Sequence, residues 1–356
     1  MSLTTARAGL TPQQWDDKFF MEYVRENRFK RYMGTDENSI IQLKEDLGTK
    51  PGNKVTFASV NKLSGAGQTG NATLEGNEEE LDTRSMAVTV NPLRHAVAVT
   101  NWDEQKSAID LRNAAKMALK LWSMDKMKYA IIDALGSING TAFASADATA
   151  RNAWVVDNAD RVQFGKLKSN YSATFATALG NIDNTDDKLT AAAVSLMKRI
   201  AQTASPAIRP IRLSEDEEWF VLFANSRAFR DFSNDTAVQQ ANREARVRGM
   251  DNPLFTGGSL VWDGVIVREI PEIGYTSNGS IECGPVYLCG AQAVGVAWAQ
   301  RTKTTTQVRD YNFRNGVGVQ EIRGVEKLIF GSGSGDTDDL KDHGVVTGWF
   351  AAVADA

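Results

Sequence analysis

The glycines of Gly65-Ala-Gly-Gln-Thr-Gly70 form a G-x-G-x-x-G string, the pattern of a turn that binds phosphate. In dinucleotide-binding proteins this turn ends a buried strand and opens a helix whose first amide groups face the pyrophosphate. Here the next residues, 71–80, are polar and acidic and have no apolar helical face. Acidic side chains beside a phosphate would also repel it. A soluble nucleotide-binding enzyme therefore stays an alternative that rests on this string alone, and a loop tip is the favoured interpretation.

Other candidates for chemistry are few. The sequence has two histidines, and His95 stands in a strand-like run, which favours a structural role for it over catalysis. Residues 331–335 read Gly-Ser-Gly-Ser-Gly but lack the strand-to-helix elbow that exposes a nucleophilic serine. The acidic segments 183–187 and 336–339 lack the spacing of a calcium loop, and the first is expected to be a solvated turn with a helix cap. We expect no catalytic residue, no metal site and no cofactor.

The composition is that of a globular protein. Of 356 residues, 42% are hydrophobic and 24% are charged. The formal net charge of −4 argues against a protein that coats nucleic acid, because such proteins carry a basic surplus. No apolar run of about 18 residues is present and residues 1–15 lack a signal-peptide core, so a soluble, cytoplasmic protein is expected. Cys283 and Cys289 are expected to be reduced and buried.

The elements around the glycine string follow the order strand, long loop, strand, long helix. Residues 54–60 and 85–90 read as strands, and residues 64–82 between them are rich in Gly and Glu. A further strand-like run at 95–100 leads into a predicted helix at 101–135, which would be ~50 Å long. A compact domain rarely carries such a polar loop unless the loop has a function. The order therefore predicts assembly with a neighbour rather than catalysis.

Local signals define the two helices of the N-terminal third. Asn101 is the expected N-cap of the long helix, with Glu104 in the capping-box position. An earlier helix is predicted from Thr11-Pro12 to Gly34, where the glycine would take the C′ position. Its apolar residues form a stripe that suits docking outside its own domain.

The remainder interleaves helices and strands, which predicts a mixed α and β class. Residues 137–184 have a weak pattern and are expected to be a loop-bearing insertion. A helix is predicted at 189–201, with Asp186 and Asp187 as cap candidates. The other predicted elements are a doubly buried strand at 218–224, a helix pair at 225–248, strands at 260–262 and 265–270 around the hairpin signal Asp263-Gly264, an undecided segment at 291–299, and strands at 321–330 and 344–350.

Distinctive stretches of sequence are distributed along most of the chain. They are Ile40-Ile-Gln-Leu-Lys-Glu-Asp-Leu47, Gly52-Asn-Lys-Val-Thr-Phe57, Gly70-Asn-Ala-Thr-Leu-Glu-Gly-Asn-Glu-Glu79, Leu93-Arg-His-Ala-Val97, Arg209-Pro210, Arg248-Gly-Met-Asp-Asn-Pro-Leu-Phe-Thr-Gly257, Cys289-Gly-Ala-Gln-Ala293 and Asp342-His-Gly-Val-Val-Thr-Gly348. In this order they resemble the tailed-phage major capsid protein family that includes the coat protein of the N4-like podoviruses.

The resemblance implies an α+β chain with the Hong Kong phage-type major capsid fold. The implied parts are an N-terminal arm at 1–50, an extended loop with its flanking strands at 54–90, a peripheral domain at 91–139 with a spine helix at 101–135, an axial domain at 140–260, and return strands at 261–356.

The implied function is that of a major capsid protein, without enzymatic activity. Such a protein self-assembles into pentamers and hexamers of an icosahedral phage head that encloses double-stranded DNA, bound on the inner face without sequence specificity. It would assemble in the host cytoplasm and reside in the virion, with portal and decoration proteins as further partners and no membrane. Residues 1–50 leave no room for a fused scaffolding segment, so a scaffolding protein is expected to be separate. An encapsulin-like compartment shell of the same fold is the alternative.

Contacts between subunits are expected on the arm and the loop tip. The residues are Phe19, Phe20, Tyr23, Gly65, Gly67, Gly70, Glu75, Glu78 and Glu79. The glycines, together with Gly76, would act as hinges that let one sequence tolerate slightly different angles. The acidic residues would meet Lys or Arg on an adjacent subunit.

Overall fold

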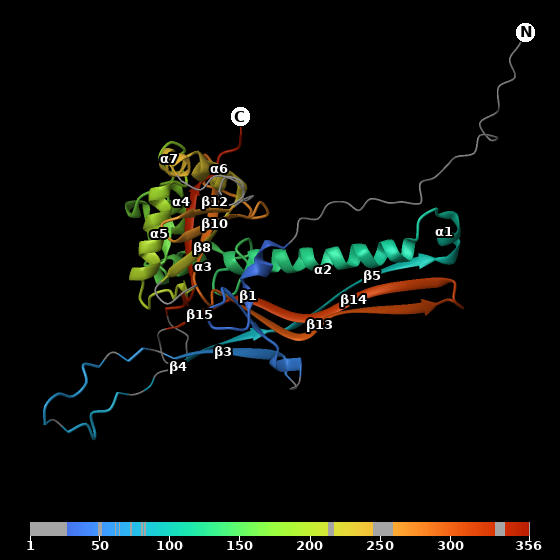
Figure 1. Cartoon of the computed structure of the whole chain (residues 1–356), viewed down its shortest axis with the longest axis horizontal. Coiled ribbons are helices and arrows are strands. Elements are labelled where there is room, and N and C mark those ends of the chain that lie inside the picture. Colours follow the sequence, from blue (N-terminus) through green and yellow to red (C-terminus); the bar gives the residue numbers. More distant parts are fainter. Residues whose placement is uncertain are drawn as a thin grey trace, which may run out of the picture. The chain divides into compact units, whose positions relative to one another are not determined.

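The computed structural model describes residues 27–48, 52–60, 62–63, 65–71, 73–79, 81, 83–212, 217–244, 259–331 and 339–355. The chain divides into two compact units, whose elements are shown in Figure 1. The first unit contains Pro92–Met127 and Gln300–Ile322, and the second contains Arg28–Asn91, Lys128–Ala299 and Arg323–Ala356. Among the helices in the described ranges, none is long and apolar enough to span a membrane.

The second unit is built on a sheet whose central strands are almost entirely apolar. The strand order is β6-β17-β12-β8-β10-β9, with β11 paired to β12 and β7 paired to β8. β8 is parallel to β10 and antiparallel to β12, which is antiparallel to β17. The bounds are β6 Val162–Phe164, β7 Ile211–Arg212, β8 Glu218–Ala224, β9 Ser259–Trp262, β10 Val265–Glu269, β11 Thr276–Ser277, β12 Glu282–Cys289 and β17 Val345–Ala351. Every residue of β17 is buried, as expected for a strand covered on both faces.

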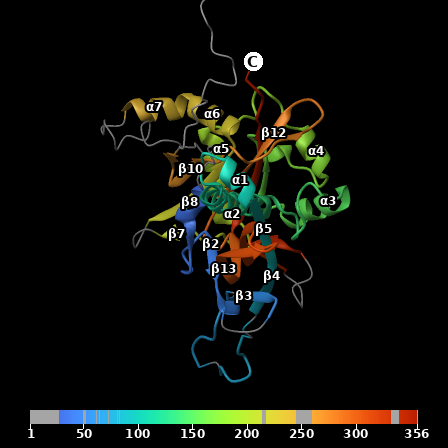
Figure 2. The same ribbon diagram turned by 90° about the vertical axis from the view of Figure 1, so that its right-hand side faces the viewer.

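Helices cover both faces of this sheet. Successive side chains on a strand point to opposite sides, so neighbouring residues contact different helices. Phe350 of β17 belongs to the apolar cluster with α5 (Ala191–Thr203) and α6 (Ser226–Asn234). Its neighbour Trp349 belongs to the cluster with α3 (Ala148–Asp157) and α4 (Phe175–Gly180). Figure 2 shows α3 and α4 to the right of the strands, and α6 with α7 (Thr236–Glu244) to the upper left. Phe29 adds to the α3 side, since its ring lies 4.9 Å from that of Phe223.

Shorter elements complete the second unit. β2 is parallel both to β1 and to the first residues of β13, while β3 pairs with β4 and β15 with β16. Their bounds are η2 Arg28–Tyr32, β1 Met33–Gly34, β2 Ile41–Lys44, η3 Asp46–Gly48, β3 Lys54–Val60, β4 Thr83–Thr89, η4 Lys168–Asn170, β15 Ile329–Phe330 and β16 Lys341–Asp342.

The first unit is a three-stranded sheet packed on one helix. Within it the strand order is β13-β14-β5, from β13 Val294–Arg309, β14 Arg314–Lys327 and β5 Asn91–Thr100. Leu119 of α2 (Leu111–Gly136) forms the apolar contact with the sheet. Its partners are Val317, Val319 and the partly buried Val97. The alternation of β14 therefore places every second side chain against α2.

The single helix predicted at 101–135 is wrong, because the chain forms two helices. α1 spans Asn101–Lys106, and α2 begins at Leu111. Ser107 ends α1 in an extended conformation, and its hydroxyl accepts a bond from the Ile109 amide. Asp110 then accepts from the Asn113 amide at 3.0 Å and so caps α2. Short polar side chains that bond nearby backbone compete with helix continuation, which explains the break. The N-cap of α1 is Thr100, one residue before the predicted one.

Most predicted strands are confirmed. The strands at 54–60 and 218–224 have the predicted bounds, and the segment at 291–299 resolves as the start of β13. Asp263 and Gly264 have φ of 47° and 72°, the left-handed pair that a tight hairpin requires. The helix pair is present as α6 and α7 within the described residues.

Three local predictions in the first half of the chain have different outcomes. Residues 137–184, predicted as a loop-bearing insertion, contain α3, β6 and α4 between their loops, elements too short to show a clear period. Gly34 does not end a helix; it lies in β1, where an added Cβ would collide with the Ser39 hydroxyl. The predicted helix before residue 27 lies outside the described residues.

Asp187 is neither solvated nor a helix cap. It is buried, and its carboxylate accepts bonds from the amides of Lys166 and Asp183 at 2.7 and 3.0 Å. The N-cap of α5 is Thr190, whose hydroxyl accepts from the Ala193 amide. Asp187 thus organises the preceding turn instead of the helix.

A buried ionic cluster joins α3, β14 and β16 in the second unit. Lys327 Nζ lies 2.8 Å from Asp342 Oδ2, and the two side chains are 1% and 2% exposed. Trp154 Nε1 donates to the same oxygen at 3.3 Å, and Asn158 Oδ1 accepts from the Asp342 amide at 2.8 Å. The buried Arg161 donates to the Asp342 carbonyl oxygen. Since each buried charge must be compensated, Lys327 and Asp342 depend on each other.

Replacing Lys327 with Met should lower the free energy of unfolding of the isolated subunit by about 3–5 kcal/mol, because Asp342 would stay buried without its cation. Urea unfolding measures the change. The control is Lys116→Met at an exposed position of α2, which should change the same quantity by less than about 0.5 kcal/mol. Equal losses in the two variants would contradict a special role for the buried pair.

His343 should make the subunit sensitive to acid. Burial, with smaller contributions from Arg161 and Arg84, lowers its pKa from 6.5 to about 4. Between pH 6.5 and 4 the unfolded chain therefore binds a proton at His343 that the folded chain does not bind. The contribution of His343 to folding stability is fully present above pH 6.5 and is lost as the pH falls towards 4. The loss should reach about 3 kcal/mol. Urea unfolding across this range should show a steeper pH dependence in the wild type than in His343→Gln; parallel curves would refute this.

Candidate assembly surfaces

The loop between β3 and β4 is the longest open segment of the second unit. The two strands pair antiparallel along all seven residues of each, so the loop leaves and returns at adjacent strand ends. Val55, Phe57 and Val88 are buried at its base. All described residues of 62–81 are exposed and lie in coil or turn, which Figure 1 shows as an open coil. The ladder fixes both ends of the loop, but the tip has no core of its own.

The glycine string is not a phosphate cradle. Gly65 to Gly70 lie in coil, and the described chain stays without a helix until after β4 and β5. No helix N-terminus therefore faces the string, as a dinucleotide site requires. Gly67, Gly70 and Gly76 have φ of 70°, 68° and 86°, a region that other residues rarely adopt. These glycines shape the loop backbone.

Two of the predicted contact residues also hold the loop together. Glu79 accepts a hydrogen bond from the Gly65 amide at 2.7 Å, across 14 positions of the chain. A Cβ at Gly65 would lie 2.7 Å from the same carboxylate oxygen, so a larger residue there would have to displace the Glu79 side chain. Glu78 accepts from the Gly76 amide at 2.8 Å. Sequence spacing alone did not indicate these bonds, because they depend on how the loop folds back.

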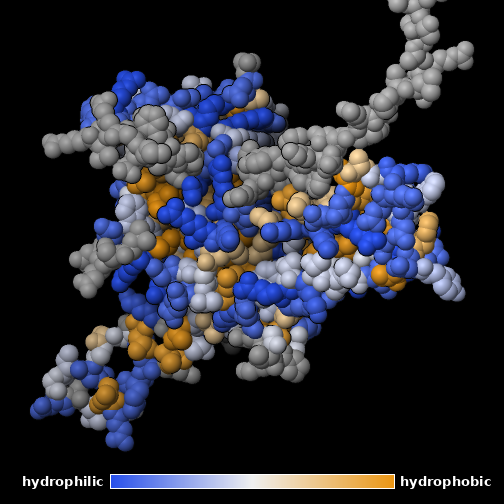
Figure 3. Space-filling view, turned by 45° about the vertical axis from the view of Figure 1, so that its right-hand side comes forward, coloured by the Kyte–Doolittle hydropathy of each residue, from blue (hydrophilic) through white to orange (hydrophobic). Residues whose placement is uncertain are grey.

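The loop exposes apolar side chains next to its acidic ones. Leu63, Leu74 and Leu81 are 54%, 61% and 59% exposed, and Glu75 follows Leu74 directly. The loop is the projection at the lower left of Figure 3, where hydrophobic and hydrophilic surface alternate. Several exposed leucines on one segment are typical of a surface that another protein covers.

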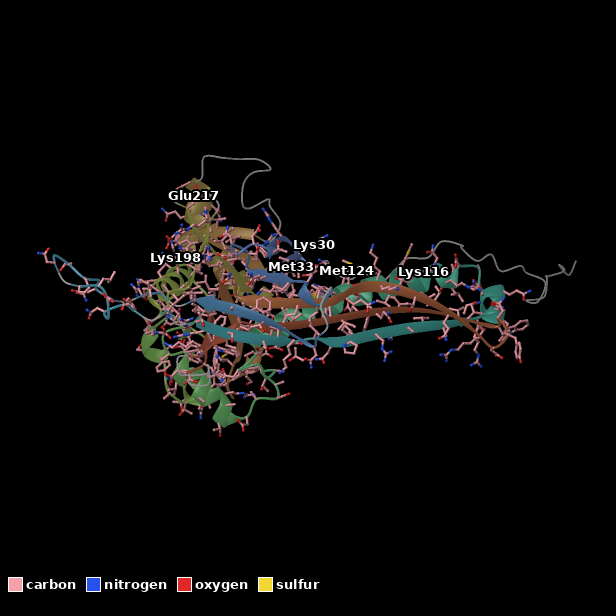
Figure 4. All side chains as sticks on the ribbon, turned by 90° about the horizontal axis from the view of Figure 1, so that it is seen from below. Lys30, Met33, Lys116, Met124, Lys198 and Glu217 are labelled. Atoms are coloured by element: carbon pink, nitrogen blue, oxygen red, sulfur yellow. The ribbon has the colours of Figure 1, made fainter. Side chains whose placement is uncertain are left out.

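The first unit has a second mixed surface along α2. Met117 and Met124 are 45% and 37% exposed, and the exposed Lys116 and Lys120 lie on the same stretch of the helix. Figure 4 labels Lys116 and Met124 on α2. Exposed methionines at helical spacing beside lysines fit a partner that brings both apolar and acidic groups.

The turn between β13 and β14 is tied to the start of α1. The Asn101 amide donates to the Phe313 carbonyl at 2.9 Å, and its side chain donates to the Asn312 carbonyl at 2.6 Å. Asn101 Oδ1 also accepts from Asn315 at 2.7 Å. Tyr311, with φ of 48°, is 105% exposed at this turn. The sequence predicts Asn101 as a helix cap, whereas its bonds to a distant turn appear only in the structure.

The histidines and cysteines of the chain lie in surroundings that suit a structural role. The ring of His95 lies 4.7 Å from that of Trp122, and His343 is held neutral by burial. Cys283 and Cys289 are free and buried, as predicted. Burial and Asp187 raise the pKa of Cys283 to about 11, so it stays a thiol at neutral pH. In the described part of the chain, no group of three or more His, Cys, Asp or Glu residues could hold a metal ion.

The structure gathers only part of the predicted contact set. Gly65, Gly67 and Gly70 lie on one leg of the loop, with Glu75, Glu78 and Glu79 on the other; the Gly65–Glu79 bond joins the legs. Phe19, Phe20 and Tyr23 lie outside the described residues. The arrangement suits recognition of another protein chain.

Comparison with known proteins gives a consistent result along the whole chain. A sequence model of the family described as phage capsid protein matches residues 4–353. The major capsid protein of Pseudomonas phage KPP25 is 26% identical over 380 residues, covering 97% of each chain.

Solved capsid structures are also similar. The capsid of Cyanophage Pam1 has a TM-score of 0.90 at 40% identity, covering 100% of each chain. The capsid of Ralstonia phage GP4 has a TM-score of 0.76 at 21% identity, again covering 100% of each chain. The second likeness bears on the fold alone, whereas the first, with the family match, bears on family membership.

Proposed function

We propose how this chain, which belongs to the phage capsid protein family, builds a phage head. It is a major capsid protein of a tailed phage, and its α+β fold is the Hong Kong phage-type capsid fold. Its role is structural, and copies of it form a multi-subunit shell. Membership of the N4-like subgroup stays a prediction.

The loop at residues 61–82 carries the proposal for how copies join. It has exposed leucines and glutamates, its ends are fixed by the β3–β4 ladder, and its described tip is exposed throughout. A segment that buries no surface in its own subunit gains stability by burying surface on another. Pentamers and hexamers then form when this loop lies on the next copy, and the left-handed glycines Gly67, Gly70 and Gly76 absorb the differing angles.

We assign the remaining parts of the chain as the resemblance to the capsid family implies. Residues 1–50 act as the arm, 54–90 as the extended loop with its strands, 91–139 as the peripheral domain, 140–260 as the axial domain, and 261–356 as the return strands. The shell encloses double-stranded DNA, with a separate scaffolding protein, a portal and decoration proteins as further partners. Assembly takes place in the host cytoplasm. No enzymatic step is assigned to the chain.

Deleting residues 64–76 should abolish shell formation and leave the subunit folded, because none of the described residues of this segment is a buried core residue. Sedimentation velocity should show slow particles for the variant and fast shells for the wild type. Thermal unfolding of the subunit should change by only a few degrees. Normal shells from the deletion variant would refute the role of the loop.

A replacement of the same segment by an equal length of Gly and Ser separates loop length from loop chemistry. It should also fail to form shells, because it removes Leu74 and Glu75. The contents of wild-type shells isolated from infected cells distinguish a phage head from an encapsulin-like compartment. Nucleic acid inside supports the proposal, and protein cargo without nucleic acid would overturn it.

A further inference from the structure

A cavity of about 260 Å³ lies in the second unit, where the last turn of α2 meets β12 and β17. Asp133 and Ala144 line this cavity and are exposed, so they lie at its mouth. Tyr287 and Trp349 also line it but are only 4% and 3% exposed, so they form its floor. A cavity of about 150 Å³ already accommodates a benzene-sized molecule. This pocket therefore has room for one aromatic ring with a short side chain.

Aromatic rings form much of the pocket wall. Phe143 and Tyr275 line it, and the ring of Phe143 lies 5.3 Å from that of Trp349. A guanidinium group packs on each of the two wall rings from outside the pocket. That of Arg151 lies 4.4 Å from the Phe143 centroid, and that of Arg227 lies 4.3 Å from the Tyr275 centroid. Fixed rings around a cavity suit a flat aromatic ligand, because aromatic pairs pack edge to face or offset.

The floor of the pocket has buried polar groups that lack a partner. Within the described part of the chain, Trp349 Nε1 and Thr347 Oγ1 have no hydrogen-bond partner. Both residues line a second cavity of about 10 Å³, which shares Tyr287 with the larger one. Such a cavity has the size of one oxygen atom with its hydrogens. Since a buried donor without an acceptor is costly, an oxygen atom of a ligand placed here would be favourable.

The Tyr287 hydroxyl adds a further donor at the floor. Burial raises the pKa of Tyr287 above its ordinary value, and the nearby Asp133 is among the smaller contributions. The phenol therefore stays protonated and can donate a hydrogen bond. A Cβ built on Gly136 would lie 2.9 Å from this hydroxyl, so the end of α2 closes this side of the pocket.

The mouth of the pocket carries a negative charge. Among the described residues that line the larger cavity, Asp133 alone is charged. A carboxylate at the entrance disfavours anions such as phosphates and attracts an ammonium group. The charge therefore argues against nucleic acid as the occupant and favours a small cation with an apolar body.

We propose that this pocket binds a small phenolic amine. Its ring lies between Phe143 and Tyr275, its hydroxyl accepts from Trp349 and donates to Thr347, and its ammonium group faces Asp133. The site is complete within one subunit, so it goes beyond the proposed role in assembly and does not need a neighbouring copy. A ligand that binds only the folded subunit also raises the stability of that subunit.

Three probes of similar size test the ligand class. Isothermal titration of the full-length subunit should show that tyramine binds with a dissociation constant below about 1 mM, as expected for a ligand of this size. Phenethylamine lacks the hydroxyl, and 4-hydroxyphenylacetate replaces the ammonium group with a carboxylate. Each should bind at least about tenfold more weakly than tyramine. Absence of tyramine binding, or equal binding of the three probes, would overturn the proposal.

Variants test the location of the site. Trp349→Phe keeps a ring and removes the N–H, so it should weaken tyramine binding about tenfold and leave phenethylamine within about threefold. Ala144→Trp at the exposed mouth should block both probes, whereas Ala176→Trp at an exposed position of α4 should leave binding unchanged.

Asp133→Asn covers the case in which Trp349→Phe fails to fold, because Asp133 is exposed. This variant should weaken tyramine binding about tenfold without weakening that of 4-hydroxyphenylacetate. Tyramine binding that persists unchanged in the Ala144 or Asp133 variant would place the probe elsewhere and refute the site. Because binding is measured on the subunit, either outcome is independent of shell formation.

Discussion

The packing of the second unit depends on an ammonium group and a carboxylate that are buried together. Lys327 and Asp342 are both almost fully excluded from water, and Trp154 and Asn158 complete the bonding of Asp342. Removal of either charge leaves the other without compensation, which costs far more than a surface pair. The last strands of the chain are therefore held in register by a contact with α3, far away in sequence.

The interior of the second unit and its projecting loop differ in how much apolar surface they leave exposed. In the sheet around β8 and β17, apolar side chains fill both faces and little surface is left for partners. The described residues of the loop at 61–82 are all exposed, and their arrangement depends on left-handed glycines and on the bond between Gly65 and Glu79. Its leucines Leu63, Leu74 and Leu81 are more than half exposed in the single chain. A shell protein needs both properties, because a fixed body gives each contact its geometry and an open segment supplies the contact area.

Prediction from sequence succeeded where a local signal was complete in itself. The hairpin at Asp263 and Gly264 needs two left-handed residues, and the run at 218–224 is apolar at every position after Glu218. Prediction failed where polar side chains form hydrogen bonds to nearby backbone amides, which the sequence pattern does not show. The cap signals at Asn101 and Glu104 predicted one long helix, yet the side chains of Ser107 and Asp110 bond nearby amides and divide it. Asp187 looked like a cap because it precedes a helix, but it folds inward on its own turn.

The class of the protein, the strand-loop-strand order and the acidic, glycine-rich character of the loop follow from composition and spacing along the chain. Which side chains share a surface depends on the packing of the strands and helices. Arg94 and Lys303 are far apart in sequence, and their common face follows from strand order and from Glu321 pointing towards α2. The role of Asn101 in holding the turn at Phe313 follows from the same pairing. Alternation gives each strand two faces, but packing decides which face is covered.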